Sequence, residues 1–162
     1  MLLEFKVKNY KSFAEEAVFS MIAAPKQKGL DYSLMKTRVK GKEIKGLSSS
    51  VIYGPNASGK TNIIGAMDVL RSIVLRGNIR NSEEKSSPNP AAEALELIPN
   101  SDDTEGKPVC FSIEFYIGDA ENQFRILYEL EIDLGVFLNE DYPRRIISEN
   151  LFVNGEPVFQ RS

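Results

Sequence analysis

Residues 51–64 read VIYGPNASGKTNII, and this stretch decides the fold. From Gly54 to Thr61 it matches the pattern G-x-x-x-x-G-K-[ST], with an apolar run before it and an amphipathic segment after it. Glycines let the backbone N–H groups turn inward around phosphates, and a helix N-terminus adds partial positive charge there. The stretch predicts a phosphate-binding loop between a buried strand in 48–53 and a helix. A purely structural glycine turn is the weaker alternative.

Two side chains of this loop have distinct predicted roles. Lys60 is expected to reach the β- and γ-phosphates as a point charge, which makes it the candidate catalytic residue. The hydroxyl of Thr61 is expected to ligate Mg²⁺, which prefers hard oxygen ligands. The predicted cofactors are therefore ATP and Mg²⁺. The predicted nucleotide-binding residues of the loop are Gly54, Pro55, Asn56, Ala57, Ser58, Gly59, Lys60, Thr61 and Asn62.

The segments before the loop have the patterns of short strands. Residues 2–8 alternate apolar and polar side chains, which predicts a half-buried strand. The residues NYKSF (9–13) are typical of a turn, and a second strand is expected within 14–23. Residues 36–46 alternate polar side chains around a central glycine, which predicts an exposed hairpin.

The helix after the loop has its own sequence signals. Ile63, Met67, Leu70 and Val74 recur at helical spacing, so they are expected to form its buried stripe. Gly77 is a plausible C-terminal stop, because glycine accepts the left-handed conformation that ends many helices.

The rest of the chain changes character twice. Residues 78–107 are polar and contain three prolines, which predicts a surface loop around a short helical piece at 91–97. Residues 108–162 alternate strongly and contain two hairpin-like turns, which predicts an antiparallel β arm. The whole chain is thus expected to be one α/β domain with a mixed sheet, divided into 1–77, 78–107 and 108–162.

Composition excludes several classes of function. The chain of 162 residues is 42% hydrophobic and 27% charged, as in globular proteins. With one cysteine and no histidine, neither a zinc site nor a histidine-based catalytic triad is available. No apolar run is long enough to span a membrane, and the N-terminus lacks the apolar core of a signal peptide. The interpretation is a cytoplasmic protein with no membrane partner.

Charge is unevenly distributed along the chain. Residues 1–80 carry 14 Lys and Arg against 6 Asp and Glu, whereas residues 81–162 carry 6 against 17. The basic half could attract a nucleotide or nucleic acid. No dense run of basic residues is present, so solvated faces that partly neutralise each other are the favoured interpretation over a nucleic-acid groove.

Two stretches together resemble a known family. The N-terminal LLEFKVKNYKSF, followed some forty residues later by VIYGPNASGKTNIIGAMDVL, resembles the N-terminal lobe of ABC-type ATPase heads of the SMC/RecF group. The greatest similarity is to AAA-family ATPases related to OLD and abortive-infection proteins. The later ISENLFVNGEPVFQR is similar to the antiparallel arm of these heads. The combination with NYKSF is more particular than the glycine loop alone.

The resemblance implies further site residues and partners. It places Lys11 and Ser12 of the NYKSF turn near the phosphates, with a solvated turn as the equal alternative, and Asn56 near the γ-phosphate or a dimer partner. In such heads a downstream C-terminal lobe supplies an acidic Asp-Glu site and a signature motif. Asp133 and the pair Glu140–Asp141 do not fit that acidic pattern convincingly. The resemblance therefore implies an N-terminal portion that a C-terminal lobe completes, a homodimer, and DNA as a further candidate partner.

Three functions compete at this point. The first is an ATPase lobe that hydrolyses ATP when completed and dimerised, with roles in DNA maintenance or phage defence. The second is a non-hydrolysing module in which nucleotide controls association with a partner. The third, a small P-loop kinase, is the weakest, because about fifty residues precede the loop and Arg144–Arg145 sit in a strand-like context.

Overall fold

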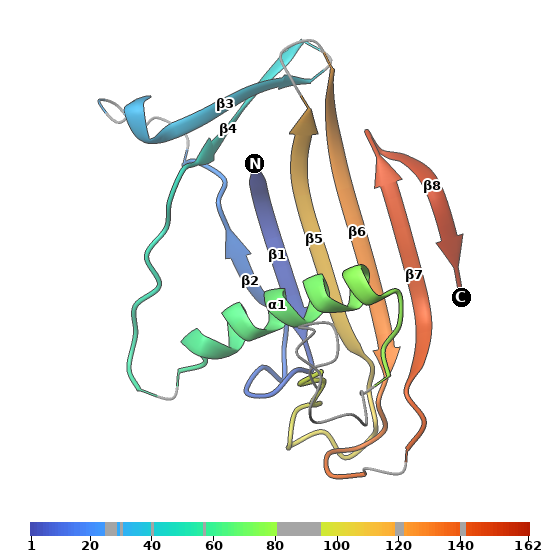
Figure 1. Ribbon diagram of the computed structural model, residues 1–162. Helices are drawn as coiled ribbons and strands as arrows, with labels where there is room; N and C mark the ends of the chain where they lie inside the picture. Colours follow the sequence, from blue (N-terminus) through green and yellow to red (C-terminus); the bar gives the residue numbers. More distant parts are fainter. Residues whose placement is uncertain are drawn as a thin grey trace, which may run out of the picture.

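The structure is a computed structural model, and it describes residues 1–24, 29, 31–39, 41–56, 58–80, 95–118, 122–139 and 142–162. One sheet of six strands dominates this part of the chain, in the order β2-β1-β5-β6-β7-β8. Its strands are β1 (Leu2–Lys8), β2 (Ala17–Ser20), β5 (Val109–Gly118), β6 (Gln123–Asp133), β7 (Arg145–Val153) and β8 (Glu156–Arg161). One long helix, α1 (Lys60–Arg76), crosses one face of the sheet (Figure 1).

The pairing of the strands corrects the expected mixed sheet. Every pair of neighbouring strands in the described residues is antiparallel, including β1 with β5, which lie a hundred residues apart in sequence. The predicted β arm is therefore continuous with the N-terminal strands. Antiparallel pairing lets sequential strands such as β5 to β8 be joined by short connections, which a parallel arrangement would not allow.

A two-stranded hairpin lies beside the end of the large sheet. It consists of β3 (Leu34–Val39), preceded by the 3₁₀ turn η1 (Asp31–Ser33), and β4 (Lys42–Leu47). The backbone N–H of Arg38 donates to Oε1 of Gln123 at 3.0 Å, which ties the hairpin to β6. The hairpin that the alternation of residues 36–46 predicted is thus present and extends slightly further at both ends.

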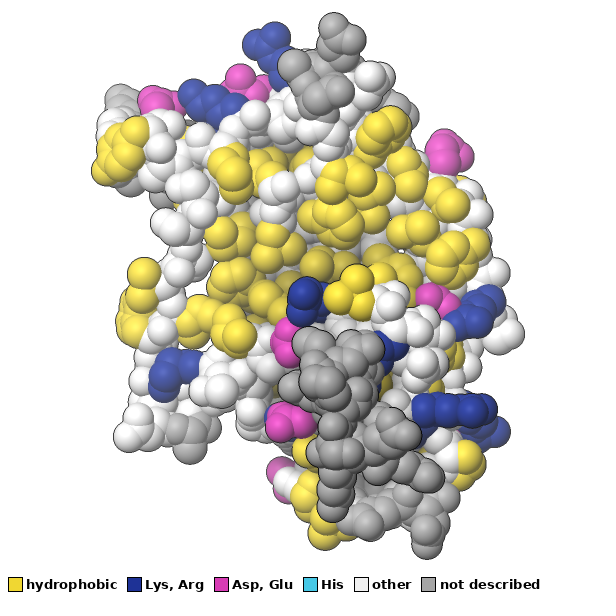
Figure 2. All heavy atoms as spheres, viewed as in Figure 1, with side chains coloured by type: hydrophobic (Ala, Val, Ile, Leu, Met, Phe, Trp, Pro, Cys, Tyr) yellow, Lys and Arg dark blue, Asp and Glu magenta, His cyan; other side chains and the backbone are white. Residues whose placement is uncertain are grey.

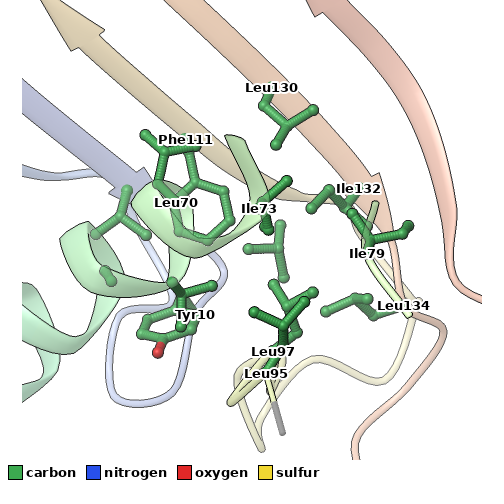
Figure 3. Close-up of a cluster of buried hydrophobic side chains, with 14 of the residues drawn as sticks. Tyr10, Leu70, Ile73, Ile79, Leu95, Leu97, Phe111, Leu130, Ile132 and Leu134 are labelled. Carbon is green, nitrogen blue, oxygen red and sulfur yellow. The ribbon is translucent and has the colours of Figure 1, made fainter. Parts of the chain in front are cut away.

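The core lies between the sheet and α1 (Figure 3). Alternation along the strands directs one set of apolar side chains toward the helix, as a pleated strand requires. The sheet contributes Phe5, Val7, Phe111, Leu130 and Ile132, which are at most 2% exposed. Tyr10, from the turn after β1, packs edge-on against Phe111 with ring centroids 5.8 Å apart. This contact joins the first turn of the chain to the centre of the sheet.

The buried stripe of α1 differs from the predicted one. Ile63 and Leu70 are buried as expected, but Val74 is 56% exposed and Ile73 takes its place in the core. Ala66 and Val69 complete the buried face of α1. The predicted stop is confirmed, because Gly77 has φ 68° and its N–H caps the carbonyl of Ile73. Apolar residues surround much of this helix, so periodicity alone did not decide which side would face the sheet.

The strand expected before the glycine loop is not formed, which corrects a second prediction. Residues 48–53 are outside every strand, and the side chains of Val51 and Tyr53 are 83% and 90% exposed. A strand needs a neighbour for its backbone hydrogen bonds. This segment runs away from the sheet on its way to α1 (Figure 1), so no described strand lies beside it.

The polar insertion contributes to the core more than its composition predicts. Most of the helical piece predicted at 91–97 lies outside the described residues, and residues 95–97 are not helical. Leu95 and Leu97 are both 5% exposed and pack in the core. Leu95 and Leu97 are two residues apart, and such side chains face the same side in an extended backbone but not in a helix. No helix in the described part of the chain is long and apolar enough to cross a membrane.

Candidate phosphate-binding site

The glycine loop connects the exposed 48–53 segment to the first turn of α1. Gly59 is the N-cap residue of α1 and has φ 86°, a conformation in which side chains are strained. No side chain caps this helix end. The first N–H groups of α1 are therefore left for a ligand or water, and the helix dipole makes a phosphate a favourable one.

The lysine of the loop turns back onto the carbonyl groups of the loop itself. Nζ of Lys60 donates to the carbonyl oxygen of Gly54 at 2.9 Å and to that of Pro55 at 2.6 Å. The N–H of Ser58 donates to the same Pro55 carbonyl at 3.3 Å. The Lys60 ammonium, which the sequence predicts to bind the β- and γ-phosphates, thus donates to carbonyl oxygens of the loop. A bound nucleotide would exchange these contacts for phosphate oxygens.

The remaining loop residues are placed at the solvent side of this arrangement. Pro55, Asn56 and Thr61 are exposed, so the amide and the hydroxyl are accessible to a ligand. Ala57, a further predicted contact, lies outside the described residues. The described residues of the loop thus lie together at the N-terminal end of α1.

The NYKSF turn lies directly against this loop. Nδ2 of Asn62 donates to Oγ of Ser12 at 2.7 Å, although fifty residues separate the two. A Cβ added to Gly59 would lie 2.9 Å from both Ser12 Oγ and an edge atom of the Phe13 ring. Ser12 and Phe13 therefore pack on the glycine that begins α1. The structure brings together Ser12 and Asn62, two predicted site residues.

The side chain of Lys11 points to a different partner. Its ammonium forms an ion pair with Glu96 and lies 5.6 Å from the centroid of the Tyr10 ring. Burial alone would lower the pKa of Lys11, but the hydrogen bond that its ammonium donates to Glu96 and the charge of that carboxylate raise the pKa above the ordinary value. Lys11 therefore remains charged, and it would have to leave Glu96 to reach a phosphate.

Two buried asparagines hold the turn in place, and sequence reasoning missed both. Nδ2 of Asn9 donates to Oδ2 of Asp103 at 2.9 Å and to the carbonyl of Lys107 at 2.6 Å. Nδ2 of Asn100 donates to the carbonyl of Lys11 at 2.6 Å. Asn9 also adopts φ 52°, which asparagine tolerates better than most residues. Asn9 opens the NYKSF motif, but its partners a hundred residues away left no sequence signal.

Asp133, the one candidate acidic residue that the structure describes, is bound by residues of the β6–β7 connection. Oδ2 of Asp133 accepts hydrogen bonds from the Tyr142 hydroxyl at 2.8 Å and from Arg145 at 2.9 Å. Asp133 therefore organises the connection between β6 and β7. Glu140 and Asp141 lie outside the described residues. Within the described ranges, no three acidic or cysteine side chains gather in a metal-binding cluster.

The helix on a sheet and the glycine loop at its N-terminus define a P-loop-type nucleotide-binding α/β protein. Residues 49–155 match the family described as "AAA domain, putative AbiEii toxin, Type IV TA system". The match covers more than half of the chain, so the chain belongs to this AAA-domain family. Comparison with curated proteins and with solved structures gave no match.

Proposed function

We propose that this chain is the ATP-binding part of an ABC/AAA-type ATPase, which hydrolyses ATP when a second lobe and a second head complete the site. The observation that carries the proposal is the glycine loop at the uncapped N-terminus of α1, with the Lys60 ammonium already inside it. Preformed N–H groups, a helix dipole and a cation together favour a polyphosphate over other ligands.

ATP would bind by replacing the loop's internal contacts. Lys60 leaves the carbonyls of Gly54 and Pro55 for the β- and γ-phosphates, and Thr61 offers its hydroxyl to Mg²⁺. Asn56 is free to approach the γ-phosphate or a dimer partner from the solvent side. These roles follow from the chemistry of the residues and from their common location.

Uncovered apolar surfaces support the proposal of a second lobe. Residues 51–53 form a continuous apolar run of strand-forming residues, a pattern typical of strands that are buried on both faces. In the described structure, this run pairs with no strand, and Val51 and Tyr53 are exposed.

The helix α1 also exposes Ile64, Val74 and Leu75, which are 54%, 56% and 70% exposed. Val74 and Leu75 line a groove between α1 and apolar side chains of the sheet. A large exposed apolar surface of this kind usually marks a contact with another part of the protein or with a partner. Figure 2 shows further apolar side chains gathered over the sheet face.

The family description supports a biological setting. It names an AbiEii toxin of type IV toxin–antitoxin systems. We place the chain in such a system, in agreement with the phage-defence role that the sequence resemblance implies. In this setting, nucleotide binding and turnover would control the activity of the complete protein.

Thermal unfolding with and without Mg-ATP tests the nucleotide site. At ATP a hundredfold above Kd, binding stabilises the folded state by about 2.7 kcal/mol. For a domain of this size, that raises the midpoint by roughly 5–10 °C. Lys60→Ala is expected to lose most of this shift, because the ammonium is the main charge that meets the phosphates.

A second lysine provides the control. Lys45 on β4 pairs with Glu43 at 3.4 Å and lies outside the glycine loop, so Lys45→Ala should keep the full ATP-dependent shift. The comparison uses the difference in midpoint with and without ATP, because Lys60→Ala also removes the contacts of Lys60 with the carbonyls of Gly54 and Pro55. Equal shifts in Lys60→Ala and Lys45→Ala would refute the role of Lys60.

A further inference from the structure

We infer that Ser12 and Asn62 form a clamp that positions the phosphate loop, and that they act through the loop rather than as ligands of the nucleotide. This inference rests on the proposed ATP site. The clamp is the hydrogen bond from Asn62 Nδ2 to Ser12 Oγ at 2.7 Å, between the turn after β1 and the first turn of α1. Both residues are positioning residues in this arrangement.

The contact engages the polar groups of Asn62 and Ser12 that could otherwise bind a phosphate. The Asn62 amide is a donor, and its N–H group is directed at Ser12. The Ser12 hydroxyl in turn lies next to Gly59, where a Cβ would approach its oxygen to 2.9 Å. The two side chains therefore satisfy each other at the point where the loop becomes the helix.

The turn that carries Ser12 is itself fixed to the rest of the protein. Tyr10 and Phe13 exchange two backbone hydrogen bonds, with N···O distances of 2.9 and 2.8 Å. The N–H of Lys11 donates to the carbonyl of Ile98 at 3.0 Å, and Asn100 binds the Lys11 carbonyl. Ser12 thus stands on a rigid support, which a positioning residue requires.

The glycine loop has few other contacts that could fix it. On its N-terminal side it follows the exposed 48–53 segment, which belongs to no strand. The shorter of its internal contacts come from Lys60, whose ammonium must leave them when phosphate binds, and the other is the 3.3 Å bond from Ser58 N–H to the Pro55 carbonyl. The packing of Ser12 and Phe13 on Gly59 and the bond to Asn62 do not involve this ammonium, so binding of phosphate would leave them in place. The clamp would therefore preorganise the loop for ATP.

A double-mutant cycle on Mg-ATP affinity tests the clamp. A single hydrogen bond of this kind corresponds to roughly a fivefold change in Kd. Ser12→Ala and Asn62→Ala should each weaken binding by about that factor, and the double variant should be no weaker than either single one. Ser12→Thr keeps the hydroxyl and should restore affinity. Ser20, the last residue of β2, accepts a hydrogen bond from the Ile22 N–H. Ser20→Ala therefore removes a hydroxyl outside the clamp and should leave the affinity for Mg-ATP unchanged.

Amide hydrogen exchange of the nucleotide-free protein gives a readout that does not depend on ATP. Ser12→Ala and Asn62→Ala should speed exchange by about fivefold at residues 63–66, whose N–H groups donate to carbonyls of the first turn of α1, with little change at β5 and β6. If wild type does not bind ATP but exchange responds, the proposed function fails and the clamp stands. Unchanged affinity and exchange in Ser12→Ala would overturn the clamp. So would losses that multiply in the double variant, because they would indicate two independent nucleotide ligands.

Discussion

The absence of a side chain at Gly59 has two structural effects, one on the backbone and one on packing. Its φ of 86° allows the chain to turn into α1, and its bare Cα leaves room for Ser12 and Phe13. The motif predicts a glycine here for phosphate binding, but the contact with the NYKSF turn is visible only in the structure. The two halves of the sequence signature therefore meet at this residue.

Replacing Gly59 should separate these two effects. Gly59→Ala is expected to lower the free energy of unfolding by about 1–3 kcal/mol from backbone strain, with a further loss because Ser12 and Phe13 must move. Gly41 is a matched control, since it has φ 78° but nothing within 4 Å of an added Cβ. Chemical denaturation of both variants gives the packing cost as the difference. Equal losses would show that the packing on Gly59 is unimportant.

At the scale of elements, the connection between β6 and β7 depends on one carboxylate. Asp133 accepts hydrogen bonds from Gly135 N–H, the Tyr142 hydroxyl and Arg145. Burial alone would raise its pKa, but these donors and the Arg145 charge lower the pKa below its ordinary value. The charged form is therefore the one that the fold stabilises.

This pKa shift predicts how stability depends on pH. Because the folded pKa lies below the unfolded one, the contribution of Asp133 is present above about pH 4 and is lost as pH falls through the folded pKa. Asp133→Asn should lower the free energy of unfolding by about 1–2 kcal/mol at pH 7 and progressively less in acid. Denaturant unfolding at pH 7, 5 and 3 measures this. A loss that stays constant at pH 3 would contradict the charge as the cause.

An exposed aspartate controls for the loss of a charge alone. Asp68 on α1 is 72% exposed and meets Arg71 at 3.5 Å across the helix surface. Surface pairs of this kind contribute little, because solvent screens them. Asp68→Asn should therefore change the free energy of unfolding by less than about 0.5 kcal/mol at every pH tested.

The sequence predicted elements well where the signal is local. Alternation predicted β1, β5, β6 and the β7–β8 hairpin, and the latter turns at Asn154 and Gly155, both with positive φ. Periodicity correctly predicted Ile63, Met67 and Leu70 for the core side of α1. It chose Val74 wrongly, because the adjacent Ile73 is equally apolar and is the residue that is buried.

The prediction of a strand at 48–53 was wrong, because a strand forms only where a neighbouring strand can pair with it. The motif predicted which loop residues form the candidate site. It could not predict the hydrogen bonds by which Asn9 and Asn100 hold the NYKSF turn, because their partners are far apart in sequence.

At the scale of the whole molecule, the described residues place few candidate catalytic groups at the proposed ATP site. Hydrolysis needs an aligned water, a residue that orients it and Mg²⁺ held from two sides. In the described residues, Lys60 and Thr61 stand at the loop, whereas Asp133 is engaged by Tyr142 and Arg145. Positioning and charge-stabilising groups each contribute factors of about a hundred or more to rate.

We therefore expect residues 1–162 to bind ATP but to hydrolyse it barely above background. Phosphate release by the purified chain measures this, and Lys60→Ala detects any contaminating ATPase. Addition of the second lobe, in one chain or as a separate polypeptide, should restore turnover and favour an ATP-bound dimer. Robust turnover by the chain alone that Lys60→Ala abolishes would point to an acidic residue within it, with Asp133 and Glu140 the first to test.

The pairing of β1 with β5 has a consequence for the order of folding. The strands β5 to β8 form a meander of sequential neighbours, so they can assemble through short loops. By contrast, Val7 meets Phe111 only when the chain closes a far longer loop, and α1 lies within that loop. Nucleotide-binding competence should thus arise last during refolding. Pulse-labelling that found α1 protected before β6 would exclude this order.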